Sequence, residues 1–274
     1  MSTSTPISQT VERPSASVAA GGDRASAPPA KPGFMARSMV IARRELLSYF
    51  ISPIAYVAML LFLLACGFAF YQDFQPGQPA MMRHLFDWML WFLCFIVPML
   101  CMGSISQEWA SGTIEALMTA PVTDTDVVMG KYLGSMSFVL VLFAPTLIYV
   151  ILMAVMANPR LDLGPVVSGY LGMILAGSLF VAVSLFCSSL TRSQVVAAVS
   201  AFAILAVITI LPWLVGAWAT LGDFWRRAVN QGVYARYADF SKGVIDLAHV
   251  TFFVVGTATF LFLTVKVLES RRWK

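Results

Sequence analysis

The chain has 274 residues, of which 59% are hydrophobic and 12% are charged, and its formal net charge is +4. Soluble domains are about half apolar and about a quarter charged, so this composition excludes an ordinary soluble domain and predicts an integral membrane protein. The small positive charge informs orientation in the membrane, and we expect no nucleic acid as a partner.

The first 35 residues are rich in Ser, Pro, Ala, Gly and Thr and show no apolar periodicity. This composition predicts a disordered tail, which we place in the cytoplasm. The segment lacks the apolar core and cleavage site of a signal peptide, so we expect the first membrane span to direct insertion. Residues 36–274 are expected to form one transmembrane domain.

A stretch that mixes arginines with apolar residues precedes the first span and reads MARSMVIARRELLSYFISP. Its apolar residues fall roughly on one helical face: Met35, Met39, Ile41, Ala42, Leu46 and Phe50. This pattern is typical of an amphipathic helix that lies in the membrane interface, and Ser52-Pro53 marks the turn into the span. The alternative is a helix that continues into the first span.

Six apolar runs are long enough to cross a bilayer, which takes about 20 residues in a helix. They are approximately Ile54–Tyr71, Phe86–Ile105, Leu133–Ala157, Val166–Ser188, Val195–Trp213 and Val250–Leu268. Barrel strands would alternate apolar and polar residues, whereas these runs are continuous. The sequence therefore predicts an all-α membrane protein with six transmembrane helices.

The spans contain residues that predict bends and close packing. Pro98, Pro145 and Pro212 predict kinks in spans two, three and five. Small residues in span four favour close approach of neighbouring helices, and they are Gly169, Gly172, Ala176, Gly177 and Ala182. We interpret Ser188 and Ser189 as packing residues that bond to the preceding turn.

Lysine and arginine set the orientation. With both termini in the cytoplasm, 12 of the 18 basic residues lie on that side: Arg13, Arg24, Lys31, Arg37, Arg43, Arg44, Lys131, Arg192, Lys266, Arg271, Arg272 and Lys274. The other basic residues are Arg83, Arg160, Arg226, Arg227, Arg236 and Lys242. The positive-inside rule favours this orientation, although it places an acidic segment, residues 107–132, in the cytoplasm.

Residues 107–132 form the longest polar insert between two spans on that side. Gly112 interrupts the apolar run, and an i, i+3, i+4 repeat comes after it, made by Ile114, Leu117 and Met118. Pro121 ends this short helix, and Thr123 with Asp126 resembles a capping box that starts a second one. A plain connector needs about two to eight residues, so we expect a docking function. The alternative is a surface helix resting on the bilayer.

Residues 214–249 separate the last two spans and contain several aromatic residues among charged ones. These are Trp218, Phe224, Trp225, Tyr234, Tyr237 and Phe240. Two interpretations stay open: short helices that dip into the outer interface, and an ordinary extracytoplasmic loop with anchoring aromatics.

The insert resembles the signature of ABC-2-type permeases, the membrane subunits of a class of ABC transporters. The matching residues are Glu108, Gly112-Thr113, Glu115, Leu117, Pro121-Val122 and Gly130-Lys131. In that family the segment contains a cytoplasmic coupling helix that fits a groove on the ATPase subunit. The resemblance implies docking through Glu108, Gly112, Thr113, Ile114, Glu115, Leu117, Met118 and Pro121. Trp109 stands where the family often has a basic residue.

Further stretches match in the same order. ARRELLSYFISPIAYV resembles the start of the gliding-motility (Gld-type) branch, and LFVAVSLFCSSLTRSQVVAAVSAFAIL resembles its hairpin between spans four and five. FSKGVIDLAHVTFF resembles the approach to its last span. The branch name does not itself imply gliding.

The resemblance implies a permease subunit of an ATP-driven exporter in a bacterial inner membrane. The chain has no G-x-x-x-x-G-K-[ST] loop, so we expect it to be no enzyme and to carry no cofactor, with ATP and Mg²⁺ bound by a partner ATPase. The expected partners also include a second permease copy, identical or different, an extracytoplasmic auxiliary protein and the lipid bilayer. Lipid, polysaccharide, peptide, metal and drug substrates are all compatible with this pattern.

A different class of function is a membrane scaffold that carries ATPase-driven mechanical work of a gliding or envelope machinery, without a transported small substrate. An enzyme or an ion-coupled transporter is disfavoured, because both need converging ionisable groups at membrane depth. Asp87 and His249 lie near span ends, where an interfacial position is expected. The four cysteines lie in apolar runs and are expected to be buried apolar residues.

Overall fold

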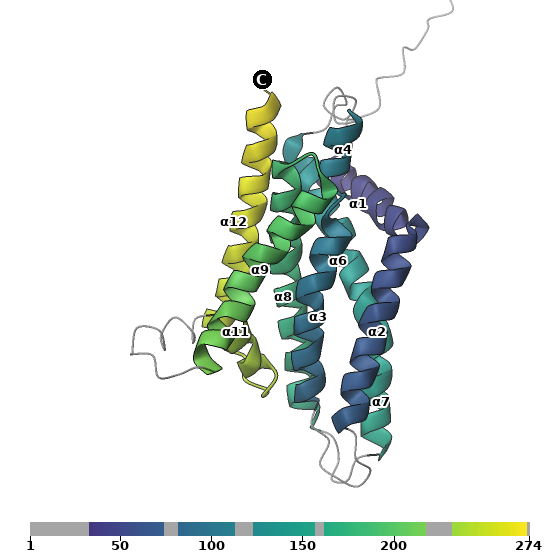
Figure 1. Ribbon diagram of the computed structural model, residues 1–274, viewed down its shortest axis with the longest axis vertical. Helices are drawn as coiled ribbons and strands as arrows, with labels where there is room; N and C mark the ends of the chain where they lie inside the picture. Colours follow the sequence, from purple (N-terminus) through teal and green to yellow (C-terminus); the bar gives the residue numbers. More distant parts are fainter. Residues whose placement is uncertain (1–32, 74–81, 113–122, 157–161, 218–231, 273–274) are drawn as a thin grey trace, which may run out of the picture. The chain divides into compact units, whose positions relative to one another are not determined.

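The computed structural model describes residues 33–73, 82–112, 123–156, 162–217 and 232–272. The described helices belong to one compact unit, Gly33–Lys274. All regular elements in the described residues are helical (Figure 1). The predicted disordered tail lies outside the described residues, except that helix α1 already includes Phe34 and Met35.

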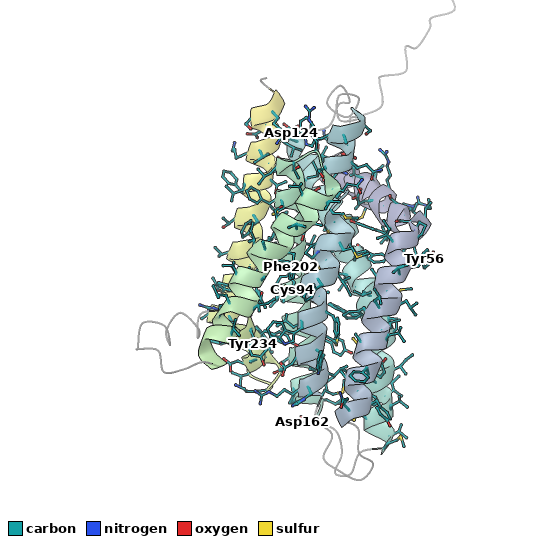
Figure 2. The ribbon with its side chains drawn as sticks, in the orientation of Figure 1. Tyr56, Cys94, Asp124, Asp162, Phe202 and Tyr234 are labelled. Carbon is teal, nitrogen blue, oxygen red and sulfur yellow. The ribbon has the colours of Figure 1, made fainter. Side chains whose placement is uncertain are left out.

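Six helical stretches in the described residues are long and apolar enough to cross a membrane. They are Pro53–Gln72, Arg83–Ser111, Asp124–Met156, Leu163–Leu190, Gln194–Pro212 and Leu247–Arg271. Asp124 begins the third of these stretches, and Asp162 directly precedes the fourth. In Figure 2 the two residues lie at opposite ends of the helices. The prediction of an all-α integral membrane protein is confirmed, and each predicted span falls within or close to one of these stretches.

Helix α1 (Phe34–Ile51) ends before the first span begins. Ser52 is extended, with φ −79° and ψ 124°, and α2 (Pro53–Asp73) starts at the next residue. A residue before proline avoids the helical region, so Pro53 forces the break. The predicted turn at Ser52-Pro53 is confirmed, and the alternative of one continuous helix is wrong.

The packed face of α1 differs from the predicted apolar face. Its buried residues are Ser38, Ala42 and Tyr49, whereas Met35 and Met39 are exposed. This face lies along the first half of α6 (Asp124–Phe143). The small side chains of Ser38 and Ala42 suit this face, because close approach of two helices excludes bulky side chains at the points of contact.

Two glycines of α6 permit that close approach. A Cβ at Gly130 would lie 2.6 Å from Ile41 Cβ and 2.9 Å from the carbonyl oxygen of Ser38. A Cβ at Gly134 would lie 2.6 Å from Glu45 Cβ and 2.8 Å from the Ala42 carbonyl oxygen. The spacing is that of a G-x-x-x-G packing motif, which was not among the features predicted from the sequence.

The start of α6 confirms the predicted capping box. Thr123 Oγ1 accepts a hydrogen bond from the Asp126 N–H at 3.2 Å, and the Thr123 N–H donates to Asp126 Oδ2 at 2.9 Å. From Asp124 the helix runs without interruption to Phe143. The helix that this capping box was predicted to start is therefore α6 itself, which continues into the third span.

The third span is broken once, as its proline predicts. A 3₁₀ turn, η1 (Ala144–Thr146), contains Pro145 and separates α6 from α7 (Leu147–Met156). Pro98 and Pro212 instead lie inside α3 (Arg83–Cys101) and α9 (Gln194–Ala217).

Helix α8 (Leu163–Leu190) lies at the centre of the bundle and contacts α3, α6, α9 and α12 (Leu247–Arg272). The prediction that small residues let neighbours approach it is confirmed. Gly169 lies against the ring of Phe86, and a Cβ at Gly172 would lie 2.7 Å from Phe240 Cβ. All four cysteines are buried and free, as expected.

The segment between the last two spans contributes a packed helix. Helix α11 (Val233–Phe240) contacts α8 and α9, and its Tyr237 and Phe240 are completely buried. Of the two interpretations, the short-helix one holds for this part, but these two aromatics lie in the protein core and do not anchor an interface. Trp218, Phe224 and Trp225 lie outside the described residues.

We expect Gly134→Ala to destabilise the protein, because the new methyl group meets a backbone oxygen that cannot move independently. Overpacking of this kind costs about 1–3 kcal/mol. The melting temperature in detergent should fall by several degrees. Gly177→Ala is the matched control, since its Cβ would meet a methyl group of Val139 at 3.2 Å. Equal melting temperatures for the two variants would contradict the close-packing role of Gly134.

Candidate functional site

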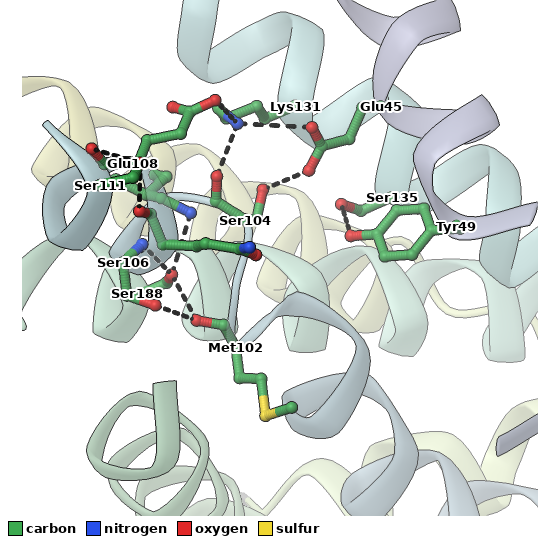
Figure 3. Close-up of polar contacts among 12 residues, drawn as sticks. Glu45, Tyr49, Met102, Ser104, Ser106, Glu108, Ser111, Lys131, Ser135 and Ser188 are labelled. Carbon is green, nitrogen blue, oxygen red and sulfur yellow. Dashed lines mark hydrogen bonds and ion pairs between the residues drawn. The ribbon is translucent and has the colours of Figure 1, made fainter. Parts of the chain in front are cut away.

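The chain turns sharply at one end of α3, between Met102 and Ile105, before α4 (Ser106–Ser111) begins. Ser188 of α8 satisfies the backbone of this turn. Its Oγ donates to the Met102 carbonyl oxygen at 3.0 Å and accepts from the N–H groups of Ile105 at 3.1 Å and Ser106 at 3.0 Å (Figure 3). Ser188 therefore bonds across helices, whereas the predicted bond to its own helix is made by Ser189, with Phe186.

Helix α4 ends at Gly112, which adopts a left-handed conformation with φ +73°. Such a position favours glycine, because other residues clash there. Gly112 therefore does interrupt the helix, as predicted. The chain leaves α4 here and returns at Thr123, the cap of α6, so both ends of the intervening segment are fixed. Six predicted docking residues lie outside the described residues: Thr113, Ile114, Glu115, Leu117, Met118 and Pro121.

Lys131 of α6 joins this region to two other elements. Its Nζ donates to Glu108 Oε1 of α4 at 2.8 Å, to the Ser104 carbonyl oxygen at 2.6 Å and to Glu45 Oε2 of α1 at 3.4 Å (Figure 3). Lys131 is only 3% exposed. One ammonium group thus connects α1, the turn after α3, α4 and α6. We call these groups the Lys131 junction.

The charges of the Lys131 junction are unequal. Two carboxylates, those of Glu45 and Glu108, share one ammonium group. The Ser104 hydroxyl donates to Glu45 Oε1 at 2.6 Å and so stabilises part of the excess negative charge. Buried charges are costly unless paired, so removing one partner is far more disruptive than the net strength of the pair suggests. The geometry of the junction is therefore strongly specified.

A second ion pair ties α1 to the first turn of α6. Arg37 Nη1 lies 3.3 Å from Asp126 Oδ2, and the Asp126 side chain is completely buried. Asp126 thus serves both the capping box and the contact with α1. A negative side chain in the first turn is also favoured by the helix dipole.

Tyr49, on the same side of α1, contacts α6. Its hydroxyl lies 2.9 Å from Ser135 Oγ, and its ring centroid lies 5.1 Å from that of Phe138. Burial, with smaller contributions from the Cys101 thiol and the Glu45 carboxylate, raises the pKa of the Tyr49 hydroxyl well above its ordinary value. The group therefore stays neutral and acts as a hydrogen-bonding contact.

The ring of Trp109 in α4 contacts the guanidinium group of Arg271, which belongs to α12. The guanidinium carbon of Arg271 lies 5.0 Å from the Trp109 ring centroid, a cation–π geometry. Arg271 Nη2 also donates to the Leu190 carbonyl oxygen at the end of α8. Where the resembling family often carries a basic residue, this chain places an aromatic ring and supplies the positive charge from α12.

A cavity of about 340 Å³ opens beside the Lys131 junction. Its wall includes charged and polar side chains of four helices, α1, α4, α6 and α9, among them Arg44, Glu45, Gln107, Glu108, Lys131 and Gln194. The cavity is thus polar although it lies at the ends of apolar spans.

The opposite end of the bundle holds a separate polar group. Asp239 Oδ2 lies 3.0 Å from His249 Nε2, and Lys242 Nζ lies 3.1 Å from Asp239 Oδ1. Desolvation raises the pKa of Asp239, but the hydrogen bonds and charges of Lys242 and His249 outweigh it and lower the pKa overall. Asp87, near the start of α3, is half-buried, and its expected interfacial position stays a prediction. Within the described ranges, no three His, Cys, Asp or Glu side chains form a metal-ligand group.

Sequence reasoning reached part of this site. It singled out Glu108, Gly112 and Lys131 through the family pattern, and it counted Lys131 among the cytoplasmic basic residues. It did not identify Glu45 as a member of the site. Its spacing from Ser38, Ala42 and Tyr49 is the signal that could have placed it on the buried face.

Replacing Lys131 with methionine leaves two neighbouring carboxylates without their cation. We expect the free energy of unfolding in detergent to fall by about 3–5 kcal/mol, the usual cost of breaking a buried pair. The triple variant Lys131→Met, Glu45→Gln, Glu108→Gln should recover most of this loss.

Lys266→Met is the control, because Lys266 is exposed and its pair with Glu269 is worth about 0–1 kcal/mol. Similar losses for Lys131→Met and Lys266→Met would show that the junction is not a stabilising contact.

Comparison with known protein families identifies the family of this chain. A family model described as ABC-2 family transporter protein matches residues 77–224, which is more than half of the chain and includes the Lys131 junction residues of α4 and α6. No curated protein sequence gives a significant match. The chain therefore belongs to the ABC-2 family of transporter proteins and is a multi-pass membrane permease component of an ABC transporter.

Proposed function

We propose that this chain is the permease subunit of an ATP-driven exporter, and that a separate ATPase subunit drives it by docking on residues 107–132. The family membership supports the transporter part of the proposal. Docking at this segment is supported by its polar sequence, by its likeness to the coupling segment of such permeases, and by its two fixed ends. The exporter direction rests on the family resemblance.

The observation that carries the proposal is the Lys131 junction. The segment 113–122 leaves from α4 and returns into α6, and Lys131 holds these two helices to each other and to α1. A force applied to the segment therefore reaches the ends of two spans and α1 together. Packed helices respond to such forces as nearly rigid bodies, which is how coupling moves the spans between inward- and outward-open states.

Glu108 has two roles in this proposal. Its Oε1 bonds to Lys131, and its side chain is 25% exposed. The internal bond fixes the carboxylate at the root of the segment, where it borders the surface offered to the ATPase. Gly112 contributes by ending α4 and directing the chain outward.

The partners are part of the same proposal. ATP and Mg²⁺ are bound by the ATPase, because this sequence has no phosphate-binding loop of the usual kind. Two permease copies, identical or different, complete the membrane part, and an extracytoplasmic protein is a further candidate partner. We place the complex in a bacterial inner membrane, and we place the chain in the gliding-motility (Gld-type) branch on its sequence likeness.

The proposed orientation puts both termini and the Lys131 junction in the cytoplasm. Basic residues at this end include Arg37, Arg43, Arg44 and Arg271, which is the distribution that the positive-inside rule requires. Residues 232–246, with α11, then face the opposite side.

Isolation of the tagged chain from native membranes in mild detergent tests the proposal directly. We expect an ABC ATPase at near one-to-one stoichiometry, identified by mass spectrometry. A second, different permease in the same sample would define a heterodimer. Absence of any ATPase, also after crosslinking from cysteines placed at Glu115 or Leu117, would contradict docking and leave the scaffold function as the better explanation.

We expect Glu115→Lys to weaken ATPase binding while leaving membrane insertion intact. Charge reversal at an interface typically costs at least about 1.4 kcal/mol, which is a tenfold loss of affinity. The measurement is the amount of ATPase that co-purifies with each variant. Glu269→Lys carries the same change of charge on an exposed residue of α12 and should leave co-purification unchanged. Normal recovery with Glu115→Lys would exclude this residue from the docking surface.

A further inference from the structure

A groove runs along α1 as far as Ser52, the residue that links α1 to α2, and Gln107 of α4 borders it. Its volume is about 730 Å³, and it shares Arg44, Ser48, Ser52 and Gln107 with the cavity beside the Lys131 junction. The groove and the cavity are therefore continuous. Arg43 adds a second guanidinium group to the groove. We call this the elbow groove.

The elbow groove offers positive charge that the protein itself does not neutralise. Both Arg43 and Arg44 are exposed, and in the described part of the chain neither has an ion pair or a hydrogen bond from its side chain. Arg37 and Lys131, on the same side of the molecule, are each paired with a carboxylate. Two adjacent unpaired guanidinium groups beside serine hydroxyls make a good complement for phosphate, which arginine binds in bidentate geometry.

The depth at which an anion would bind is set by the acidic groups further in. Beyond Arg44 the cavity wall contains Glu45 and Glu108, whose two negative charges face the single positive charge of Lys131. This net negative floor repels an anion. The place that favours an anion is therefore the mouth, where Arg43 and Arg44 lie with Ser48 and Ser52.

The rest of the elbow groove is apolar. Val40, Leu47 and Ile51 line it with exposed fractions of 71%, 50% and 82%. The exposed apolar surface continues onto α2, beginning with Ile54 and continuing with Val57, Leu61, Leu64 and Phe68. Because α2 crosses the membrane, this surface is the path of an acyl chain, and the matching occupant has an anionic head and an apolar tail.

We propose that the elbow groove is a binding site for an anionic phospholipid of the adjacent leaflet. Arg43 and Arg44 bind the phosphate, Ser48 and Ser52 donate hydrogen bonds to its oxygens, and an acyl chain runs along α2. The proposal goes beyond the transport function and does not depend on the ATPase. The bound lipid would brace the elbow directly beside Glu45 and the Lys131 junction.

Photocrosslinking in nanodiscs tests the proposal with the full chain alone. The probe is phosphatidylglycerol with a photoreactive group on its acyl chain, present as a minor component in phosphatidylcholine. We expect labelling of peptides from α1 and the first half of α2. Arg43→Gln with Arg44→Gln should reduce this labelling at least about tenfold, because the charge-assisted hydrogen bonds to the phosphate are lost. Arg43→Lys with Arg44→Lys should retain part of it.

Arg192→Gln is the matched control, because Arg192 is exposed and lies outside the elbow groove. Its labelling should equal that of the unchanged chain. Unaltered labelling of the Arg43/Arg44 glutamine variant would overturn the proposal. An equal loss in Arg192→Gln would reduce the effect to general surface charge and also overturn it. Competition by millimolar inorganic phosphate as effective as that by unlabelled phosphatidylglycerol would identify a site for free phosphate and exclude the lipid.

Discussion

The buried ammonium group of Lys131 is the contact on which the architecture of the proposed cytoplasmic end depends. It is held by Glu45, Glu108 and the Ser104 carbonyl oxygen, so three segments that are separate in sequence meet at one atom: α1, the turn with α4, and α6. An apolar contact at this place would tolerate sliding of one helix on another. A buried charge with three specific acceptors does not, because any displacement leaves part of the charge unpaired in a medium of low polarity.

The packing around the Lys131 junction is organised to keep that atom in place. Gly130 and Gly134 bring α1 close enough to α6 for Glu45 to reach Lys131, and Ser188 holds the turn that presents the Ser104 carbonyl oxygen. Arg37 and Asp126 form a second connection on the same pair of helices, and Arg271 covers Trp109 on α4. Contacts of four kinds thus meet in this region: close backbone approach, hydrogen bonding, ion pairing and a cation–π contact.

The features that could be predicted from the sequence are local. The spans are readable from continuous apolar runs, the break at Ser52-Pro53 from proline sterics, and the start of α6 from Thr123 and Asp126, which are three residues apart. Glu45 and Lys131 are 86 positions apart, and their pairing depends on how α1 packs on α6. The face of α1 that packs on α6 was not predicted for a related reason: the apolar residues of an interfacial helix are expected to face lipid, so apolar character alone does not mark the protein-facing side.

The left-handed Gly112 and the Thr123 capping box have a consequence for how such permeases diverge. Gly112 ends α4 through its left-handed backbone, and Thr123 begins α6 through reciprocal hydrogen bonds with Asp126, which itself belongs to α6. Residues 113–122 are thus inserted between two self-sufficient termini. Selection can rewrite that stretch to suit a different ATPase while the membrane-embedded helices keep their folding instructions. The segment is in this sense modular, and partner choice can evolve separately from the architecture of the spans.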